Sequence, residues 1–411
     1  MSYLINLSVL RRNRNFRFLF TGQFISLFGS MITYVALPYQ IYHLTNSTLM
    51  VGLLSLFQLL PLMVTALIGG ALADRHHRRT LLLISEGLLA IGCLLLALNA
   101  YQPQPSIPVL FIVAFFMSGI TGLHRPALDS INQQIVDKKD FAMVGALATF
   151  NYSVGMIAGP AVGGIIIGHF GIGITYLVDF ATFLISWIAI LCITDIPKPA
   201  APPVESALAS VKQGFFYAIS RQELLGSYVV DFCAMVFGMP MALFPAIAEH
   251  SGGVQTLGML YSAPAVGALL ISCFSGFVEK IKRHGAAIAI AAAFWGVAII
   301  GFGFAKNLWL GLFFLMLAGL FDAASGMFRQ LLWNETIPNN FRGRLSGIEM
   351  ISYLSGPKLG DTEAGLVAAA FGITASVVSG GILCVITVGL CCVWLPGFWR
   401  YRSTVTSSSV N

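Results

Sequence analysis

Long apolar runs are the feature of this chain that most restricts its fold. A helix needs about 20 mostly apolar residues to cross a bilayer, and runs of that length recur along all 411 residues. The composition agrees, since 57% of the residues are hydrophobic, only 10% are charged, and the mean hydropathy is +0.83. Soluble domains carry about 25% charged residues. The sequence therefore predicts an all-α polytopic membrane protein.

Twelve membrane-spanning helices fit the apolar runs. Their expected ranges are residues 16–43, 47–73, 80–100, 107–135, 140–168, 171–194, 224–249, 254–280, 285–305, 308–337, 343–371 and 373–396. The rhythm breaks after the sixth run, at a proline-rich linker. Leu208, Val211, Phe215 and Ile219 then recur at helical spacing and predict an amphipathic helix on the membrane surface. We expect three parts: an N-terminal six-helix bundle (1–194), a cytoplasmic linker with this helix (195–223), and a C-terminal six-helix bundle with a short tail (224–411).

The basic residues predict the orientation of the chain. If the N-terminus is cytoplasmic, nineteen of the 23 Lys and Arg residues fall on the cytoplasmic side and only Lys306 falls outside. Lys and Arg are enriched in cytoplasmic loops, so we expect both termini in the cytoplasm. Orientation also explains the formal net charge of +6, and a nucleic-acid partner is not expected.

Two motifs recur at an offset of about 200 residues. His124-Arg125-Pro126 in the fourth run corresponds to Phe328-Arg329-Gln330 in the tenth, and Gly159-Pro160 with Gly163 corresponds to Gly356-Pro357 with Gly360. A repeat of six spans predicts two bundles related by an axis along the membrane normal.

The loop Gly70-Ala-Leu-Ala-Asp74-Arg75-His76-His77-Arg78-Arg79 joins the second and third runs. It resembles the signature loop of the major facilitator superfamily at the same place, except that His77 stands where the family usually has Gly. The resemblance implies that Asp74 docks against the start of span 11, near Arg344, and that Arg78 pairs with an acid at the end of span 4. The expected conformational latch is Gly70, Asp74, Arg75, Arg78, Asp129 and Arg344. A basic loop that only sets orientation is the alternative.

Span 5 carries small residues at close intervals: Gly155, Gly159, Pro160, Gly163 and Gly164. Such residues let helix backbones approach closely, and a proline bends the helix. The pattern resembles the antiporter motif of exporters in the superfamily, which implies export. Ordinary close packing is the alternative, and both can hold together.

The opening segment, residues 14–29, resembles a narrower group of bacterial exporters that includes enterobactin-type siderophore exporters and macrolide efflux pumps. Arg125-Pro126-Ala127 and Arg342-Gly343-Arg344 resemble the same group. This resemblance implies the bacterial inner membrane. The segment 114–119 lacks the Arg that drug–proton antiporters often carry early in span 4, and Arg125 lies about 9 Å further along a helix. The usual proton-relay assignment therefore does not transfer.

Charged residues inside spans are costly in lipid and normally face a cavity. Span 11 is the richest, with Lys358 and Asp361 at a spacing that allows pairing. The candidates for substrate binding or proton coupling are Lys358, Asp361, Glu363, Asp231, Arg329, Asp322, Arg125 and Tyr34. Internal ion pairs that steady the helices are the alternative for any one of them, and we expect that structural role for Glu86 and Asp179.

These features predict a secondary exporter of a small hydrophilic molecule, a siderophore, by proton-coupled alternating access. Lys358 and Arg329 would hold an anionic substrate, while Asp231, Asp361 and Glu363 would carry protons. The alternative is a multidrug or macrolide efflux pump of the same fold. The expected partners are the substrate, protons and membrane lipids, for a monomer with no cofactor and no metal. An enzyme or scramblase would need a convergent His/Asp or Ser group, and the seven His residues show no such grouping.

Overall fold

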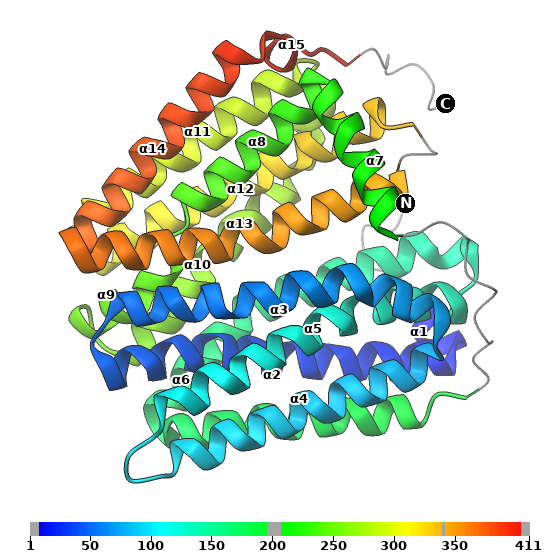
Figure 1. Ribbon diagram of the computed structural model, residues 1–411, viewed down its shortest axis with the longest axis vertical. Coiled ribbons are helices and arrows are strands. Elements are labelled where there is room, and N and C mark those ends of the chain that lie inside the picture. The colour runs from blue at the N-terminus through cyan, green and yellow to red at the C-terminus, as the bar shows by residue number, and fades with distance from the viewer. Residues whose placement is uncertain (1–7, 195–206, 339–341, 404–411) are drawn as a thin grey trace. The chain divides into compact units, whose positions relative to one another are not determined.

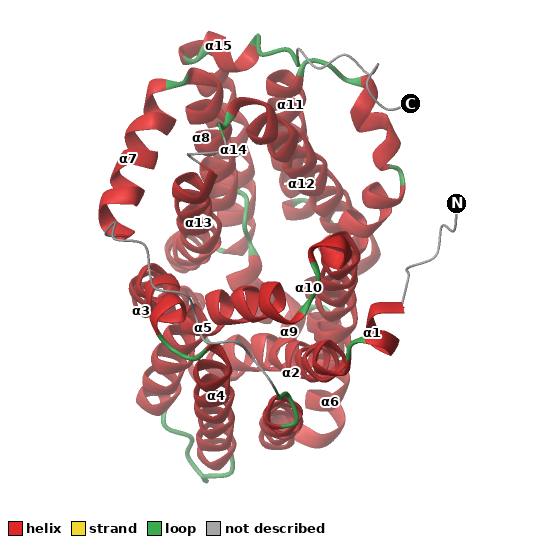
Figure 2. Ribbon diagram, turned by 90° about the vertical axis from the view of Figure 1, so that its right-hand side faces the viewer, coloured by secondary structure: helices red, strands yellow, loops and turns green. Residues whose placement is uncertain are grey.

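The computed structural model describes residues 8–194, 207–338 and 342–403, and within these ranges the chain forms helices and no strand (Figure 2). The elements, with η for 3-10 helices, are labelled in Figure 1. They are α1 Ser8–Arg12, α2 Arg14–Thr45, α3 Thr48–Arg75, α4 Arg78–Ala100, α5 Ile107–Ile135, η1 Lys138–Asp140, α6 Phe141–Leu191, α7 Ala207–Ser220, α8 Gln222–Phe237, η2 Met241–Leu243, α9 Phe244–His250, α10 Val254–Cys273, η3 Ser275–Lys280, α11 His284–Gly303, α12 Leu308–Thr336, α13 Arg342–Phe371, α14 Ile373–Trp394 and α15 Pro396–Trp399.

The described helices account for the spans that the apolar runs predict. Ten helical stretches are long and apolar enough to cross a membrane. One of them, Lys138–Leu191, is interrupted at Gly171, where φ is +82° and a side chain would be strained. It therefore holds two helices, the predicted spans 5 and 6. The 30-residue α13 matches span 11. Within the described residues this gives twelve helices of membrane-spanning length, and the predicted all-α polytopic fold is confirmed.

Local sequence sets the helix ends. Asn13 caps α2 by accepting the Phe16 N–H at 2.9 Å, and Asn307 caps α12 in the same way for Leu310 at 2.8 Å. The helix α2 ends at Asn46, which adopts the left-handed conformation that Asn tolerates.

Two spans differ from their expected form. Span 7 consists of α8 and α9 joined by η2, because Gly238 and Pro240 interrupt the helix. Span 8 was expected to continue to residue 280, yet α10 ends at Cys273 and the shorter η3 follows. Apolar composition alone does not distinguish these short turns from a continuing helix.

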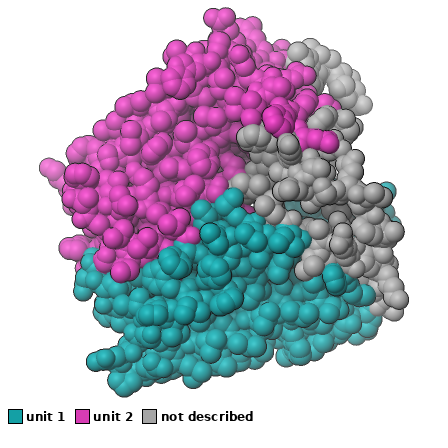
Figure 3. Space-filling model, in the orientation of Figure 1, with its two compact units in different colours: residues 1–46, 57–204, 252–262 teal, residues 47–56, 205–251, 263–411 magenta. Residues whose placement is uncertain are grey.

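The chain forms two compact units, coloured separately in Figure 3. Unit 1 contains residues 1–46, 57–204 and 252–262, and unit 2 contains residues 47–56, 205–251 and 263–411. Two helices are divided between the units. The first turns of α3 belong to unit 2 and the first turns of α10 belong to unit 1.

In unit 1, α2 packs along α6, and α4 packs against both α5 and α6. Glycine makes these approaches possible, since a Cβ added at Gly159 would overlap the Met31 side chain and one at Gly122 would overlap Thr65. The apolar core between α2, α4, α5 and α6 contains Leu19, Leu82, Ala127, Ile131, Ile190 and Ile193.

In unit 2, α13 lies alongside α8 and α14 (Figure 1), and α11 packs against α12 and α14. A Cβ at Gly360 would overlap the Met235 carbonyl oxygen on α8, and one at Gly319 would overlap the Pro264 carbonyl oxygen on α10. Close backbone contact through small residues is how membrane helices gain packing without a hydrophobic driving force.

Candidate functional site

The predicted charge group of span 11 lies in unit 2, on α13. The Asp361 side chain is buried, with 8% of the residue exposed. Its carboxylate accepts a hydrogen bond from the Ser55 hydroxyl at 2.9 Å and another from the Ala242 backbone N–H at 3.0 Å. Three segments far apart in sequence therefore meet at one carboxylate: the start of α3, η2 and α13.

Lys358 lies nearly one turn before Asp361, and the two charges interact. An ion pair in a low-dielectric interior is stronger than one in water. The sequence prediction that these two side chains share a face of the helix agrees with this interaction. The pair places one cation and one anion within the packed part of unit 2.

Glycines bring the neighbouring backbones close to this pair. A Cβ at Gly365 would lie 2.6 Å from the Thr48 carbonyl oxygen, and a Cβ at Gly52 would lie 2.9 Å from the Asp361 carbonyl oxygen. Thr362 reinforces the contact by donating to the Gly52 carbonyl at 3.1 Å. The first turns of α3 are thus fixed against α13, which positions Ser55 beside the Asp361 carboxylate.

The internal repeat shows that packing does not require these charges. When Gly159-Pro160 is aligned with Gly356-Pro357, Ala161 corresponds to Lys358 and Gly164 corresponds to Asp361. The small residues of α6 lie against the start of α10 within unit 1, as α13 lies against the start of α3 within unit 2. The first half makes this contact with Ala and Gly. The Lys and Asp of the second half therefore serve something other than close approach.

Asp231 on α8 and Arg329 on α12 form an ion pair in unit 2. Their side chains are only 11% and 12% exposed, so the pair is largely removed from water. Asp322, two turns before Arg329, interacts electrostatically with both partners. Arg does not lose its proton in proteins, so Asp231 faces a permanent cation.

The third charge of span 11 lies apart from the other two. Two residues along a helix correspond to a rotation of about 200°, so Glu363 projects away from the face that carries Asp361. Glu363 is half-buried and has no hydrogen-bond or ion-pair partner among the described residues. The structure thus brings Lys358 and Asp361 together and leaves Glu363 on another face of α13.

Two sequence candidates lie in unit 1. Arg125 is 68% exposed and lies 3.8 Å from Asp129, its neighbour one turn along α5. Tyr34 packs edge-on against Tyr261, with ring centroids 5.4 Å apart. Neither Arg125 nor Tyr34 belongs to unit 2, which contains the charged residues of α13.

The glycines of the antiporter pattern line two sides of α6. A Cβ at Gly155 would meet Leu27 at 3.3 Å, and one at Gly163 would meet the Ile32 Cα at 3.2 Å, both on α2. Gly164 faces the other way, toward Gly258 at the start of α10. This arrangement agrees with close packing, and the assignment of export polarity to it stays a prediction.

Only part of the predicted latch lies in the described residues. The side chains of Gly70, Asp74, Arg75 and Arg344 fall outside them. Asp129 is 64% exposed and forms an ion pair with Arg125. Arg79, next to Arg78, donates to the Ile190 and Leu191 carbonyl oxygens at 3.1 and 2.8 Å and so fastens the start of α4 to the end of α6. The latch stays a prediction.

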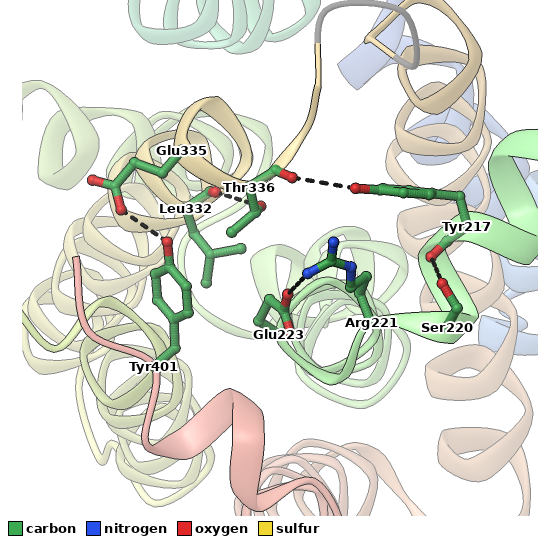
Figure 4. Close-up of polar contacts among 8 residues, drawn as sticks. All are labelled: Tyr217, Ser220, Arg221, Glu223, Leu332, Glu335, Thr336 and Tyr401. Atoms are coloured by element: carbon green, nitrogen blue, oxygen red, sulfur yellow. Dashed lines mark hydrogen bonds and ion pairs between the residues drawn. The ribbon is translucent and has the colours of Figure 1, made fainter. Parts of the chain in front are cut away.

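A second polar cluster in unit 2 fixes the end of α12 (Figure 4). Tyr401 and Ser403 each donate to the Glu335 carboxylate, at 2.9 and 2.8 Å. Tyr217 on α7 reaches the Thr336 carbonyl at 3.5 Å. Burial, followed by the hydrogen bond to Glu335, raises the pKa of Tyr401, so its phenol stays protonated and donating at neutral pH. This cluster anchors α7 and the C-terminal segment.

Comparison with known families assigns the chain. Residues 6–398 match the MFS_3 model, described as transmembrane secretion effector. The chain belongs to the MFS_3 family. Membership of this family makes the protein a transporter of a small molecule and not an enzyme.

Members named as enterobactin exporters resemble the chain over its full length. The enterobactin exporter EntS of Shigella flexneri is 28% identical over 404 residues, which are 98% of this chain and 97% of that protein. EntS of Escherichia coli O1:K1 / APEC is 27% identical over the same shares. The sequence resemblance to this exporter group is therefore confirmed.

Solved structures share the fold of this MFS_3 chain. A bacterial homologue of the human lysosomal transporter Spinster superposes with a TM-score of 0.76 at 14% identity, covering 99% of this chain and 100% of that one. A POT family transporter bound to 5-aminolevulinic acid also gives 0.76, at 12% identity over 94% and 97%.

Sequence reasoning missed the partners of the α13 charges. Ser55 lies in an ordinary apolar run, and the Ala242 N–H belongs to a backbone that the sequence predicts as helix. Neither position carries a signal of its own. The irregular stretch around Gly238 and Pro240 is the one hint that a backbone N–H is free to bind a side chain in span 7.

Proposed function

We propose that this MFS_3 protein is a secondary active exporter in a bacterial inner membrane. Its proposed substrate is a small hydrophilic anion, a siderophore. The observation that carries the proposal is the Lys358–Asp361 pair on α13, where the first half of the repeat has Ala161 and Gly164. Charges that packing does not require, inside a transporter, point to substrate or ion handling. The names of the relatives support the substrate class.

The proposed substrate contact is cationic. Lys358 lies in the packed part of unit 2, and Arg329 supplies a second positive group in the same unit. A cation in a low-dielectric site attracts carboxylates or catecholates more strongly than it would in water. Each cation lies beside an acid, Asp361 for Lys358 and Asp231 for Arg329, so an anionic chelator would compete with that acid for the contact.

Proton entry drives export in this proposal. A proton carrier must be an acid whose proton leaves and returns during the cycle. Asp361 meets this condition, since its partners are a hydroxyl, a backbone N–H and a lysine that can release its own proton. Glu363, with no fixed cation, is the second candidate. Asp231 is a weaker one because its partner is an arginine.

The test compares the culture medium and cytoplasm of wild-type and deletion strains under low iron by mass spectrometry. We expect a chelator to disappear from the medium and accumulate in the deletion strain. Complementation with Lys358→Gln should restore less than a tenth of the export, while Lys306→Gln, at an exposed lysine, should restore it fully. An unchanged medium with new sensitivity to macrolides or dyes would overturn the siderophore proposal in favour of a drug pump.

A further inference from the structure

A buried polar network in unit 1 lies outside the site described above. Glu86 on α4 is fully buried, with 0% of the residue exposed. Its Oε1 accepts a hydrogen bond from Gln23 Nε2 at 2.6 Å, and His124 Nε2 lies 3.0 Å from the same oxygen. Gln23 also donates to the Ser186 hydroxyl at 3.3 Å. Four helices, α2, α4, α5 and α6, thus contribute one residue each.

The two carboxyl oxygens of Glu86 have different surroundings. Oε2 is buried and has no hydrogen-bond partner among the described residues. An ionised carboxylate shares its charge over both oxygens, and a buried oxygen with half a charge and no donor is costly. A carboxylic acid with its proton on Oε1 donates that proton to Nε2 of a neutral His124 while Oε1 still accepts from Gln23. Oε2 is then an uncharged carbonyl oxygen.

The partner of Glu86 is what separates this network from the other buried acids. Asp231 pairs with Arg329, whose charge is permanent. Asp179, also fully buried, accepts hydrogen bonds from Thr33, Thr182 and Cys93 and has no basic partner among the described residues. His124 is the one ion-pair partner of Glu86 in the described part of the chain, and histidine exchanges protons near neutral pH.

Among the described residues, no Lys or Arg forms an ion pair with Glu86 or His124. From α6, Asp179 interacts electrostatically with Glu86, and the other groups on that side are the hydroxyls of Ser186 and Thr182. From α2, the facing residue is the neutral Gln23. On α5, Asp129 interacts with His124 and is exposed beside Arg125. Within the ranges that the structure describes, His124 is therefore the group whose proton can balance a charge on Glu86.

We propose that Glu86 and His124 form a proton-carrying site in unit 1, additional to the acids of α13. The His124 side chain is 14% exposed, so the imidazole is the group of the pair that can exchange a proton with solvent. The Glu86 carboxyl group would hold the proton inside the protein. An imidazolium Nε2 transfers its proton to Oε1 of the carboxylate, and a neutral imidazole and a neutral carboxylic acid result. Loss of that proton from the pair would leave a negative charge buried in unit 1.

This inference rests on the proposed proton-coupled export, so its test includes a measurement that needs no substrate. Infrared difference spectra of the purified full chain between acidic and alkaline pH report buried carboxylic acids through their C=O stretch. We expect a band from Glu86 that is absent in Glu86→Gln, is retained in Asp137→Asn, which removes an exposed carboxylate, and titrates at a shifted pH in His124→Gln. A spectrum unchanged in Glu86→Gln would overturn the proposal.

Transport supplies the second readout. Everted membrane vesicles with an acidic lumen would take up iron-free enterobactin, the compound in the relatives' name. The rate of this uptake should be at least tenfold lower in Glu86→Gln than in the wild type. The rate of exchange of preloaded enterobactin, measured without a pH gradient, should stay within twofold of the wild-type rate. Retained gradient-driven uptake in both Glu86→Gln and His124→Gln would overturn the site. If wild-type vesicles take up nothing, the proposed function fails while the infrared result still decides the proton site.

Should Glu86→Gln fail to elute as a folded protein on gel filtration, His124→Gln decides the question. The imidazole is partly exposed, and its loss leaves a neutral acid that Gln23 still holds. We expect this variant to fold, to shift the Glu86 band and to slow gradient-driven uptake at least fivefold. A folded His124→Gln with wild-type band position and uptake would refute the proton-carrying pair.

Discussion

At the scale of single residues, Asp361 is the side chain whose function the structure constrains best. Asp361→Asn keeps the size of the side chain and one acceptor oxygen for the Ala242 N–H, while its amide N–H can donate to the Ser55 hydroxyl oxygen. The substitution removes the acidic proton and the charge beside Lys358. We predict at least a tenfold loss of gradient-driven uptake with a thermal midpoint that changes by only a few degrees. Uptake by everted vesicles and thermal unfolding in detergent measure the two quantities. Wild-type uptake by this variant would contradict the role.

The Asp231–Arg329 pair gives a second prediction at this scale. Removing one partner of a buried ion pair leaves an uncompensated charge and costs about 3–5 kcal/mol. Asp231→Asn should therefore lower the unfolding midpoint strongly, and the double variant with Arg329→Gln should recover part of the loss. Thermal unfolding of the wild type and the three variants forms a double-mutant cycle. Additive effects would mean that the pair observed in unit 2 does not couple the two helices.

The sequence identifies the charged residues of the candidate site but not the residues that contact them. Lys358 and Asp361 are visible because charges are rare in apolar runs, and their shared face follows from helical spacing. Ser55 is more than 300 positions from Asp361, and no local pattern encodes that contact. The sequence predicts a structural role for Glu86, and no local pattern encodes its contact with His124, which lies 38 positions away.

At the scale of elements, the glycines of α13 set how closely it packs. A Cβ at Gly360 would overlap the Met235 carbonyl oxygen, and backbone atoms cannot move aside as a flexible side chain does. Gly360→Ala should therefore destabilise unit 2 by about 1–3 kcal/mol. Gly389→Ala in α14, where a Cβ would meet nothing within 4 Å, should be neutral or stabilising because Ala is the better helix former. Equal melting temperatures for both variants would contradict the packing argument.

At this scale the existence of the helices and the break at Gly171 could be predicted, but the early end of α10 could not. Apolar length identifies each span, since a bilayer fixes the length that a helix needs. The break at Gly171 is a single residue between two apolar runs, and the sequence prediction placed the boundary there, between residues 168 and 171. The end of α10 at Cys273 was missed because Phe274 and Phe277 continue the apolar composition.

At the scale of the whole molecule, the repeat of six spans rests on the glycine and proline motifs that recur in the sequence, and it stays a prediction. The division of α3 and α10 between the units could not be predicted, since both helices read as uninterrupted spans. Each of these helices carries a proline close to the point of division, Pro61 in α3 and Pro264 in α10.

Replacing these prolines tests their role in the transport cycle. Pro61→Ala and Pro264→Ala should each stabilise the protein by up to about 3 kcal/mol, because the helix regains a hydrogen bond. We expect both variants to bind the substrate with unchanged affinity and to transport it at least threefold more slowly. Pro38→Ala, in a helix that belongs wholly to unit 1, should gain stability without slowing transport. Slowing by Pro38→Ala to the same degree would contradict a special role for the divided helices.

The division of α3 and α10 has a mechanical consequence. A proline at position 61 leaves the Phe57 carbonyl without its helical donor, and one at 264 does the same for Leu260; these carbonyls lie at or within three residues of the points where α3 and α10 pass from one unit to the other. Each of these helices therefore lacks one backbone hydrogen bond close to the residue where it passes from one unit to the other. The helices α3 and α10 are two of the chain segments that connect the units, and each carries a proline close to the point where it passes from one unit to the other.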